Sequence, residues 1–177
     1  MAPADAFDAM ALDDLEEAAG ELHRRISAAL RRIGEAQAEQ PDGEQRTPRW
    51  RVASLAAALE LACASLAAVA AGGGTPDVRH DRHPALVSAL MYAAPSIPAL
   101  LTRVDQDRRL LASFSRSLDS RLGEPHVTPW GHISLRRLLS EVAIAEPARC
   151  AQALERRLAI LEAEAEARAR AEAAHQG

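Results

Sequence analysis

Four histidines in two polar segments are the residues best suited by type to bind a metal. His80 and His83 form an H-x-x-H pair, and His126 and His132 lie in a second, proline-rich segment. Neutral imidazole is a common ligand of zinc and other transition metals. In a bundle whose helices simply alternate in direction, these segments lie at opposite ends, about 37 Å apart across a helix of roughly 25 residues. We therefore expect solvent-exposed histidines, no metal site and no cofactor, unless a short helix at residues 84–94 reverses the chain.

Two carboxylates fall on the apolar faces of predicted helices, where a charge must be paired or must face a cavity. Glu60 is the only charge in a long apolar stretch, and Asp107 interrupts the apolar spacing of a later helix. We expect each carboxylate to meet an arginine, either Arg103 or Arg108. If the two carboxylates faced each other, they would instead form a proton or metal site.

The sequence carries no recognisable catalytic motif. The Glu-x-x-His pattern of di-iron bundles is missing, and so are the nucleophile elbow, the phosphate-binding glycine loop and the HExxH motif. Cys63 and Cys150 lie in helical sequence without a C-x-x-C partner, so we expect two buried free thiols. No catalytic residue is predicted, and the chain is not expected to be an enzyme.

Residues 134–158 have the apolar spacing of a helix-turn-helix, with Pro147 at the start of the recognition helix. From residue 132 onward the chain holds seven arginines and seven acidic residues, so this region has no net positive field for DNA. A kinked bundle helix is therefore the favoured interpretation. If the segment does bind DNA, the candidate reading residues are Arg149, Gln152, Arg156 and Arg157.

The two tryptophans, Trp50 and Trp130, lie in or beside turns. In the alternating topology the turns at residues 41–50 and 123–133 share one end of the bundle. Tryptophan and arginine are the types most enriched at binding hot spots. This end is therefore the candidate partner-binding surface, made of Arg49, Trp50, His126, Trp130 and His132. The alternative is that both indoles plug the end of the bundle.

Apolar residues recur at spacings of three and four throughout, and no segment alternates with period two, so the fold class is all-α. The spacing follows heptad seams, which predicts an antiparallel bundle of about four main helices. Pro, Gly and capping residues bound the helices at residues 4–40, 48–71, 84–94, 97–122 and 134–161. Residues 162–177 carry alternating Ala and charge without an apolar stripe. They are expected to form a charged helical extension with a frayed tail, beside one domain at residues 1–161.

The composition limits the class of function. The 177-residue chain has 40 Ala, 22 Leu, 3% aromatics and a formal net charge of -4, which argues against strong nucleic-acid or anionic-membrane binding. Residues 52–71 approach the length of a membrane span, but they are half alanine and carry Glu60. The first residues lack the pattern of a signal peptide. We expect a cytoplasmic protein without membrane contact.

These observations favour a non-catalytic accessory or scaffold protein that acts through helix packing with a protein partner or as a homo-oligomer. The predicted first helix exceeds the second by about twelve residues, so part of its seam is free to pack against another chain. A helix-turn-helix DNA-binding regulator is the first alternative. A four-helix bundle that binds a metal or a small ligand is the second.

Overall fold

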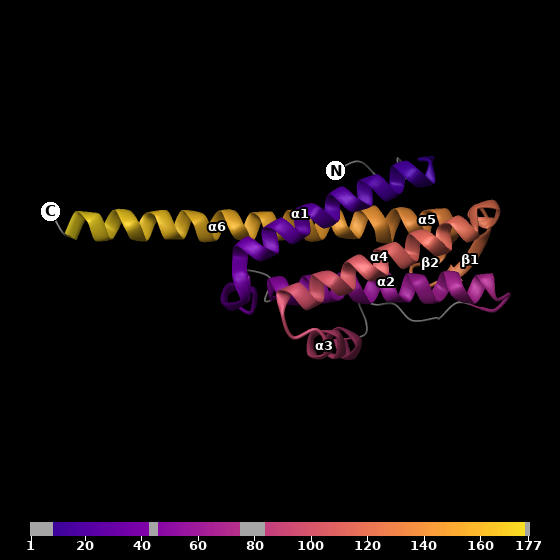
Figure 1. Ribbon diagram of the computed structural model, residues 1–177, viewed down its shortest axis with the longest axis horizontal. Helices are drawn as coiled ribbons and strands as arrows, with labels where there is room; N and C mark the ends of the chain where they lie inside the picture. Colours follow the sequence, from indigo (N-terminus) through magenta and orange to yellow (C-terminus); the bar gives the residue numbers. More distant parts are fainter. Residues whose placement is uncertain (1–8, 43–45, 75–83, 176–177) are drawn as a thin grey trace.

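The computed structural model describes residues 9–42, 46–74 and 84–175. The predicted all-α bundle is confirmed, with five main helices where about four were expected. Figure 1 shows the helices lying side by side and the last one projecting beyond the rest. The elements in chain order are α1 (Leu12–Ala38), α2 (Pro48–Ala70), α3 (Pro84–Ala93), α4 (Ile97–Ser117), the short helix η3 (Asp119–Arg121), β1 (Pro125–Thr128), β2 (Gly131–Ser134), α5 (Leu135–Leu139), the π-helical segment η4 (Ser140–Ala145) and α6 (Glu146–His175).

The predicted heptad seam of α1 faces the core. All six of its residues, Leu15, Ala19, Leu22, Ile26, Ala29 and Ile33, are buried. The helix begins at Leu12, and the earlier start predicted at residue 4 falls within residues 1–8, outside the described residues. It is kinked at Gly34, whose φ of 76° and ψ of 163° are not helical.

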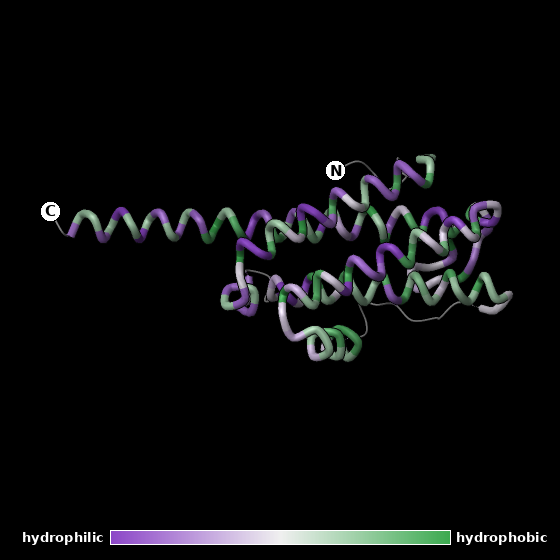
Figure 2. The backbone as a smooth tube through the Cα atoms, viewed as in Figure 1, coloured by the Kyte–Doolittle hydropathy of each residue, from purple (hydrophilic) through white to green (hydrophobic). Residues whose placement is uncertain are grey.

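Helix α2 runs through the centre of the bundle. Its start is as predicted, because Thr47 Oγ1 accepts a hydrogen bond from Trp50 N and Pro48 occupies the first turn. Apolar residues cover almost every face of it (Figure 2). It is long and apolar enough to cross a membrane, but 67% of that window is buried inside the bundle. Its neighbours bury it as the core helix of the fold.

Ion pairs fix the directions of the outer helices. Arg25 pairs with Glu155 and Arg32 pairs with Glu162, so α1 and α6 run parallel with a constant offset. Arg116, near the end of α4, pairs with Asp13 at the start of α1, so those two helices are antiparallel.

Helices α2 and α4 are parallel, which the alternating topology did not predict. Arg121 Nη1, just past the end of α4, donates to Val69 O at the end of α2 over 3.0 Å. At the opposite end, Arg49 Nη2 donates to Met91 O and Ala94 O at the joint between α3 and α4. The chain therefore returns along the bundle between α2 and α4, with α3 on the outside (Figure 1).

This return corrects the expected positions of the turns. The end of α2 and the segment after α4 lie at the same end, and the turn before α2 lies at the other. The expectation that the turns at residues 41–50 and 123–133 share one end is wrong. The short helix at residues 84–94, considered only as an exception, is present as α3, but it lies across the bundle (Figure 1) and is bent by 117° from α4.

The turn at residues 123–134 contains an antiparallel hairpin, although no strand was predicted. Pro125 pairs with Ser134, and Thr128 pairs with Gly131, whose φ of 110° suits glycine. Thr128 Oγ1 accepts from Trp130 N and donates to Gly131 O, which closes the turn. Strands of four residues are too short to show a period-two pattern, so the residue spacing does not predict them.

The last helical region is continuous from Leu135 to His175, with the π-helical segment η4 in its middle. Pro147, which has no backbone N–H to donate, is the second residue of α6 and comes directly after the π-helical turns. A helix-turn-helix requires two helices joined by a turn at a large angle. The helix-turn-helix interpretation of residues 134–158 is therefore wrong. As the favoured alternative held, these residues belong to one helical region of the bundle, interrupted by the π-helical segment and not by a turn. Beyond Leu161, every residue from 162 to 175 is exposed, as expected for an extension.

We predict that Gly34→Ala lowers the free energy of unfolding by about 1–3 kcal/mol, because a side chain is strained at this φ and ψ. Urea denaturation measures the change. Gly123→Ala is the matched control, since Gly123 has no positive φ and an added Cβ there meets nothing within 4 Å. Equal losses in the two variants would show that the kink does not require glycine.

Candidate functional site: a pocket lined by two tryptophans

An open pocket of about 350 Å³ lies between α2, the hairpin tip and the start of α6. It collects chemically diverse side chains from three separate parts of the sequence. Its lining consists of Arg46, Trp50, Arg51, Ser54, Leu55, Trp130, Glu141, Glu146, Arg149 and Cys150. Both tryptophans line this pocket.

The hairpin carries Trp130 into the pocket. Its base is tied to the end of the preceding helix, because Arg136 N donates to Leu122 O. Its tip reaches α6, where Trp130 Nε1 donates to Glu146 Oε1 over 2.9 Å. Ten residues of helix separate Arg136 from Glu146, so the hairpin folds back about 15 Å along the bundle.

Trp50 enters the same pocket from the first turn of α2. Its backbone N is fixed by the Thr47 cap, and its ring is half-buried. The guanidinium of Arg46 lies 4.5 Å from the ring centroid, which is a cation–π contact.

Ion pairs hold the remaining charged groups of the wall. Arg51 donates to Asp42 Oδ2 from Nε at 2.9 Å and from Nη2 at 2.7 Å, and both side chains are mostly buried. Arg149 Nη2 lies 2.6 Å from Glu141 Oε1. The wall is thus a set of positioned, mutually paired charges around two indoles.

Cys150 lies in the pocket wall, and burial raises the pKa of its thiol to about 12. The thiol is the reactive species only when it is ionised. Cys63 is also free and buried, and burial raises its pKa to about 12 as well. The expectation of two buried free thiols is confirmed, and neither is an activated nucleophile.

The other predicted partner-binding residues do not join the tryptophans. Arg49 points to the joint between α3 and α4, as described above, and also pairs with Glu39. His126 lies on β1 with Nε2 3.5 Å from Glu124, and His132 is exposed on β2. The hairpin pairs each histidine with an apolar residue, not with the other histidine. None of these three residues lines the pocket.

The residues proposed for DNA reading all lie on α6. Arg149 pairs with Glu141, and Gln152, Arg156 and Arg157 are exposed or half-buried on successive turns.

His80 and His83 lie in residues 75–83, outside the described residues. Within the part that is described, no group of three or more His, Cys, Asp or Glu residues could hold a metal ion.

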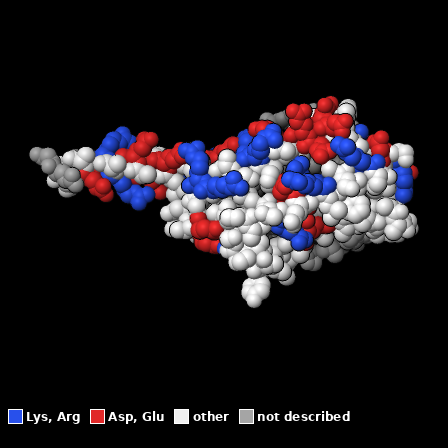
Figure 3. Space-filling model, viewed as in Figure 1, with Lys and Arg blue, Asp and Glu red and all other residues white. Residues whose placement is uncertain are grey.

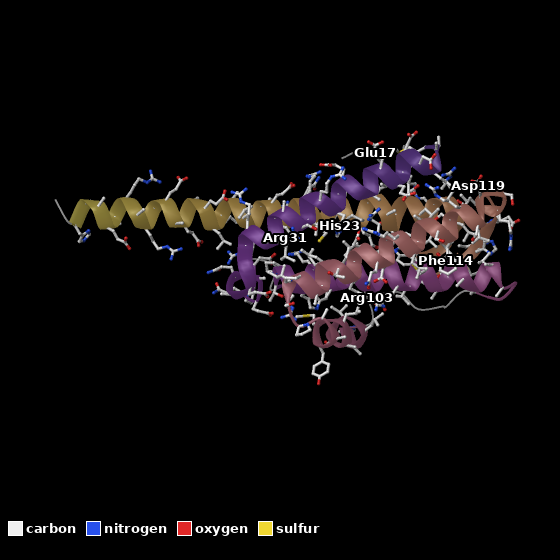
Figure 4. The ribbon with its side chains drawn as sticks, in the orientation of Figure 1. Glu17, His23, Arg31, Arg103, Phe114 and Asp119 are labelled. Carbon is white, nitrogen blue, oxygen red and sulfur yellow. The ribbon has the colours of Figure 1, made fainter. Side chains whose placement is uncertain are left out.

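Glu60 and Asp107 share one arginine between α2 and α4. Arg103 Nη2 lies 2.6 Å from Glu60, and its Nε lies 3.1 Å from Asp107 Oδ2. The expected pairing with an arginine is therefore present, and it falls to Arg103, because Arg108 pairs with Asp105. The Asp107 side chain is only 8% exposed, and burial raises its pKa despite the nearby guanidinium. Figure 4 shows Arg103 on the side of α4 away from α1.

A second polar cluster, which the sequence analysis missed, lies between α1 and α4. His23 Nε2 is 3.4 Å from Ser27 Oγ and 3.9 Å from Asp105 Oδ1. Burial is the main cause of the lowered pKa of His23, so the ring is neutral near pH 7. In a catalytic triad the serine and the carboxylate contact different ring nitrogens. Here both are closest to Nε2, so the cluster is not a relay.

Comparison with known proteins supplies the family. The sequence model of the DinB superfamily matches residues 18–144, which is most of the chain. The chain belongs to the DinB superfamily. Of the pocket, the match covers both tryptophans but ends before Glu146, Arg149 and Cys150.

The DinB-superfamily fold is also found among solved structures. The crystal structure of a structural-genomics target from Streptococcus pneumoniae is similar, with a TM-score of 0.65 over 86% of this chain and 91% of that one. The two sequences are 14% identical, so this similarity shows the fold alone. The search of curated proteins finds no match.

We predict that Arg103→Met lowers the free energy of unfolding by about 2 kcal/mol at pH 7, because it leaves two carboxylates unpaired, while its own half exposure moderates the loss. Because the pKa of Asp107 is raised, Asp107 takes up a proton in the folded protein as the pH falls. The loss of stability caused by Arg103→Met therefore becomes smaller at lower pH. Denaturation at several pH values measures this. Arg109→Met, at a pair whose arginine is largely exposed, is the control and should cost at most about 1 kcal/mol. A deficit that does not change with pH would contradict the role assigned to Asp107.

We predict that neither thiol of the native protein reacts with DTNB at pH 8, because a thiol with a pKa of about 12 is almost wholly protonated there. Two thiols per chain should react after unfolding in guanidinium chloride. Rapid reaction of one thiol in the native protein would show that the pocket activates Cys150.

Proposed function

We propose that this DinB-superfamily protein is a non-catalytic accessory protein that binds a protein partner through the pocket between α2, the hairpin and α6. The observation that carries the proposal is the convergence of Trp50 and Trp130, 80 positions apart in the sequence, on one pocket. Both indoles are half-buried. Tryptophans that are partly accessible in a concave surface are typical anchors of protein interfaces.

The polarity of the wall supports a protein partner. Sites for small molecules are mostly apolar and enclose their ligand. This pocket is open and lined mainly by polar side chains, which is typical of the hydrogen-bonding rim of an interface. Its arginines already have partners, so a bound chain would meet charges held in place instead of mobile ones.

The state of the potential reactive groups supports a non-catalytic role. The thiol of Cys150 is protonated at neutral pH, and Glu146 accepts the hydrogen bond of Trp130. A nucleophile needs an ionised or activated form, which the Cys150 thiol lacks at neutral pH. These groups instead fix the shape of the wall.

Binding of a small ligand is the second candidate. The volume of about 350 Å³ falls within the usual range for ligand pockets. Native mass spectrometry of the purified protein separates the candidates, because a retained small molecule adds a discrete mass that Trp50→Ala removes.

The proposal predicts a partner contact at Ser54, which lines the pocket. A photo-crosslinking amino acid placed there should give a discrete adduct with another protein in cells, and Trp50→Ala should abolish it. Tyr92→Ala is the control, since Tyr92 is 89% exposed on α3 and does not line the pocket. The adduct should persist in that variant. No adduct at Ser54, or one that Trp50→Ala leaves unchanged, would exclude a protein partner at this pocket.

A further inference from the structure

Beyond Glu162, the last turns of α6 have no ion-pair partner on another element within the described part of the chain. Arg32 and Glu162 make the last ion pair between α1 and α6, and every residue from 162 to 175 is exposed. Figures 1 and 3 show this segment as a bare helix carrying both signs of charge. At its root, Ile160 is 51% exposed, although α6 buries apolar residues elsewhere.

The charges of this extension follow an order: three acidic residues (Glu162, Glu164 and Glu166) precede two arginines (Arg168 and Arg170). The spacing of four would allow ion pairs within the helix, but the arginines bond elsewhere. Arg168 Nε donates to Glu164 O and Arg170 Nε to Glu166 O, each over 3.3 Å. Among the described residues, the carboxylates of Glu164 and Glu166 have no ion-pair partner.

Helix geometry sorts these residues around Ala167. At about 100° per residue, one stripe within about 40° of Ala167 contains only Ile160, Ala163, Ala167, Ala171 and Ala174. Glu164 and Arg168 flank this stripe on one side, and Glu166 and Arg170 flank it on the other. Glu172 falls on the far side of the helix. One face is thus uncharged along its whole length and bordered by charge on both edges.

We propose that two copies of this chain pair through their α6 extensions, antiparallel and centred on Ala167. A twofold axis through this point sets Glu164 of one copy beside Arg168 of the second copy, offset by about 3 Å along the helix. It also sets Glu166 beside Arg170 of the second copy, so symmetry gives four intermolecular ion pairs. Arg168 and Glu166 each also lie about 3 Å along the axis from their own counterparts, so two like-charge neighbours oppose the four pairs. Ile160 then lies against Ala174 of the second copy at each end.

Charge complementarity selects this arrangement. Parallel pairing of the same faces reverses this balance. It places Glu164 next to Glu166 and Arg168 next to Arg170 of the second copy, which gives four like-charge neighbours and only two opposite ones. Alanines on the facing stripe allow the two backbones to approach closely, while the exposed ion pairs are screened by salt. The dimer is therefore expected to be weak and salt-sensitive, with its orientation set by the charges.

A charge-swap experiment tests the pairing on the full chain. In Glu164→Arg/Glu166→Arg the four flanking residues are basic, and in Arg168→Glu/Arg170→Glu they are acidic. Sedimentation equilibrium at low salt should show at least a tenfold weaker self-association of each variant than of the unchanged protein. An equimolar mixture of the two variants should recover association to within about threefold. Circular dichroism of each variant checks that the helix is retained.

The mixture separates pairing between chains from helix stability within a chain, because neither variant alone can form the pairs. Glu172→Arg, on the far side of the helix, is the matched control and should leave association unchanged. A monomer at several hundred micromolar in low salt, or a mixture that stays monomeric, overturns the proposal. Trp50→Ala should not affect the dimer, so failure of this pairing and failure of the pocket proposal are distinguishable.

Discussion

The structure depends on covering α2, a helix that is apolar on almost every face. Most helices of a bundle need only one neighbouring face, because their other side is solvated. Helix α2 has buried residues all round, including a run from Leu55 to Leu59, so it needs neighbours on all sides. The surrounding elements α1, α3, α4 and α6 supply them, and the course of the chain follows from that requirement.

The return of the chain between the end of α2 and the start of α4 has the widest effect on the fold. A chain that simply alternated would place α4 antiparallel to α2, but the return makes them parallel. Arginine side chains secure both ends of this arrangement by bonding to carbonyl oxygens at helix ends: Arg49 at the end of α3 and Arg121 at the end of α2. The last carbonyl oxygens of a helix have no amide four residues on within the helix, and a charged donor bonds well to them; Val69 O also accepts from Gly72 N.

The parts of the fold that are local were predictable from the sequence. The α1 seam, the Thr47–Pro48 start of α2 and the exposed extension depend on spacing and capping within a few residues, and the structure contains all three. The direction of α4 and the hairpin depend on contacts across the bundle, for which the sequence has no local signal. The two tryptophans do line one pocket, but for a different reason from the one expected. Their turns begin at opposite ends, and the hairpin brings Trp130 part of the way back along the bundle.

Helix α6 connects the two surfaces that we propose as binding sites, the pocket and the C-terminal extension. Its first turns supply Glu146, Arg149 and Cys150 to the pocket, and its last turns carry the extension. Its 30 residues span about 45 Å, and the pairs of Glu155 and Glu162 with α1 hold its middle against the bundle. The π-helical segment just before Glu146 sets which residues of α6 face the pocket, since the widened turn shifts the register of the helix that follows. The same shift fixes the direction of the stripe around Ala167, because the intervening helix is regular. A single local irregularity therefore orients both surfaces relative to the bundle.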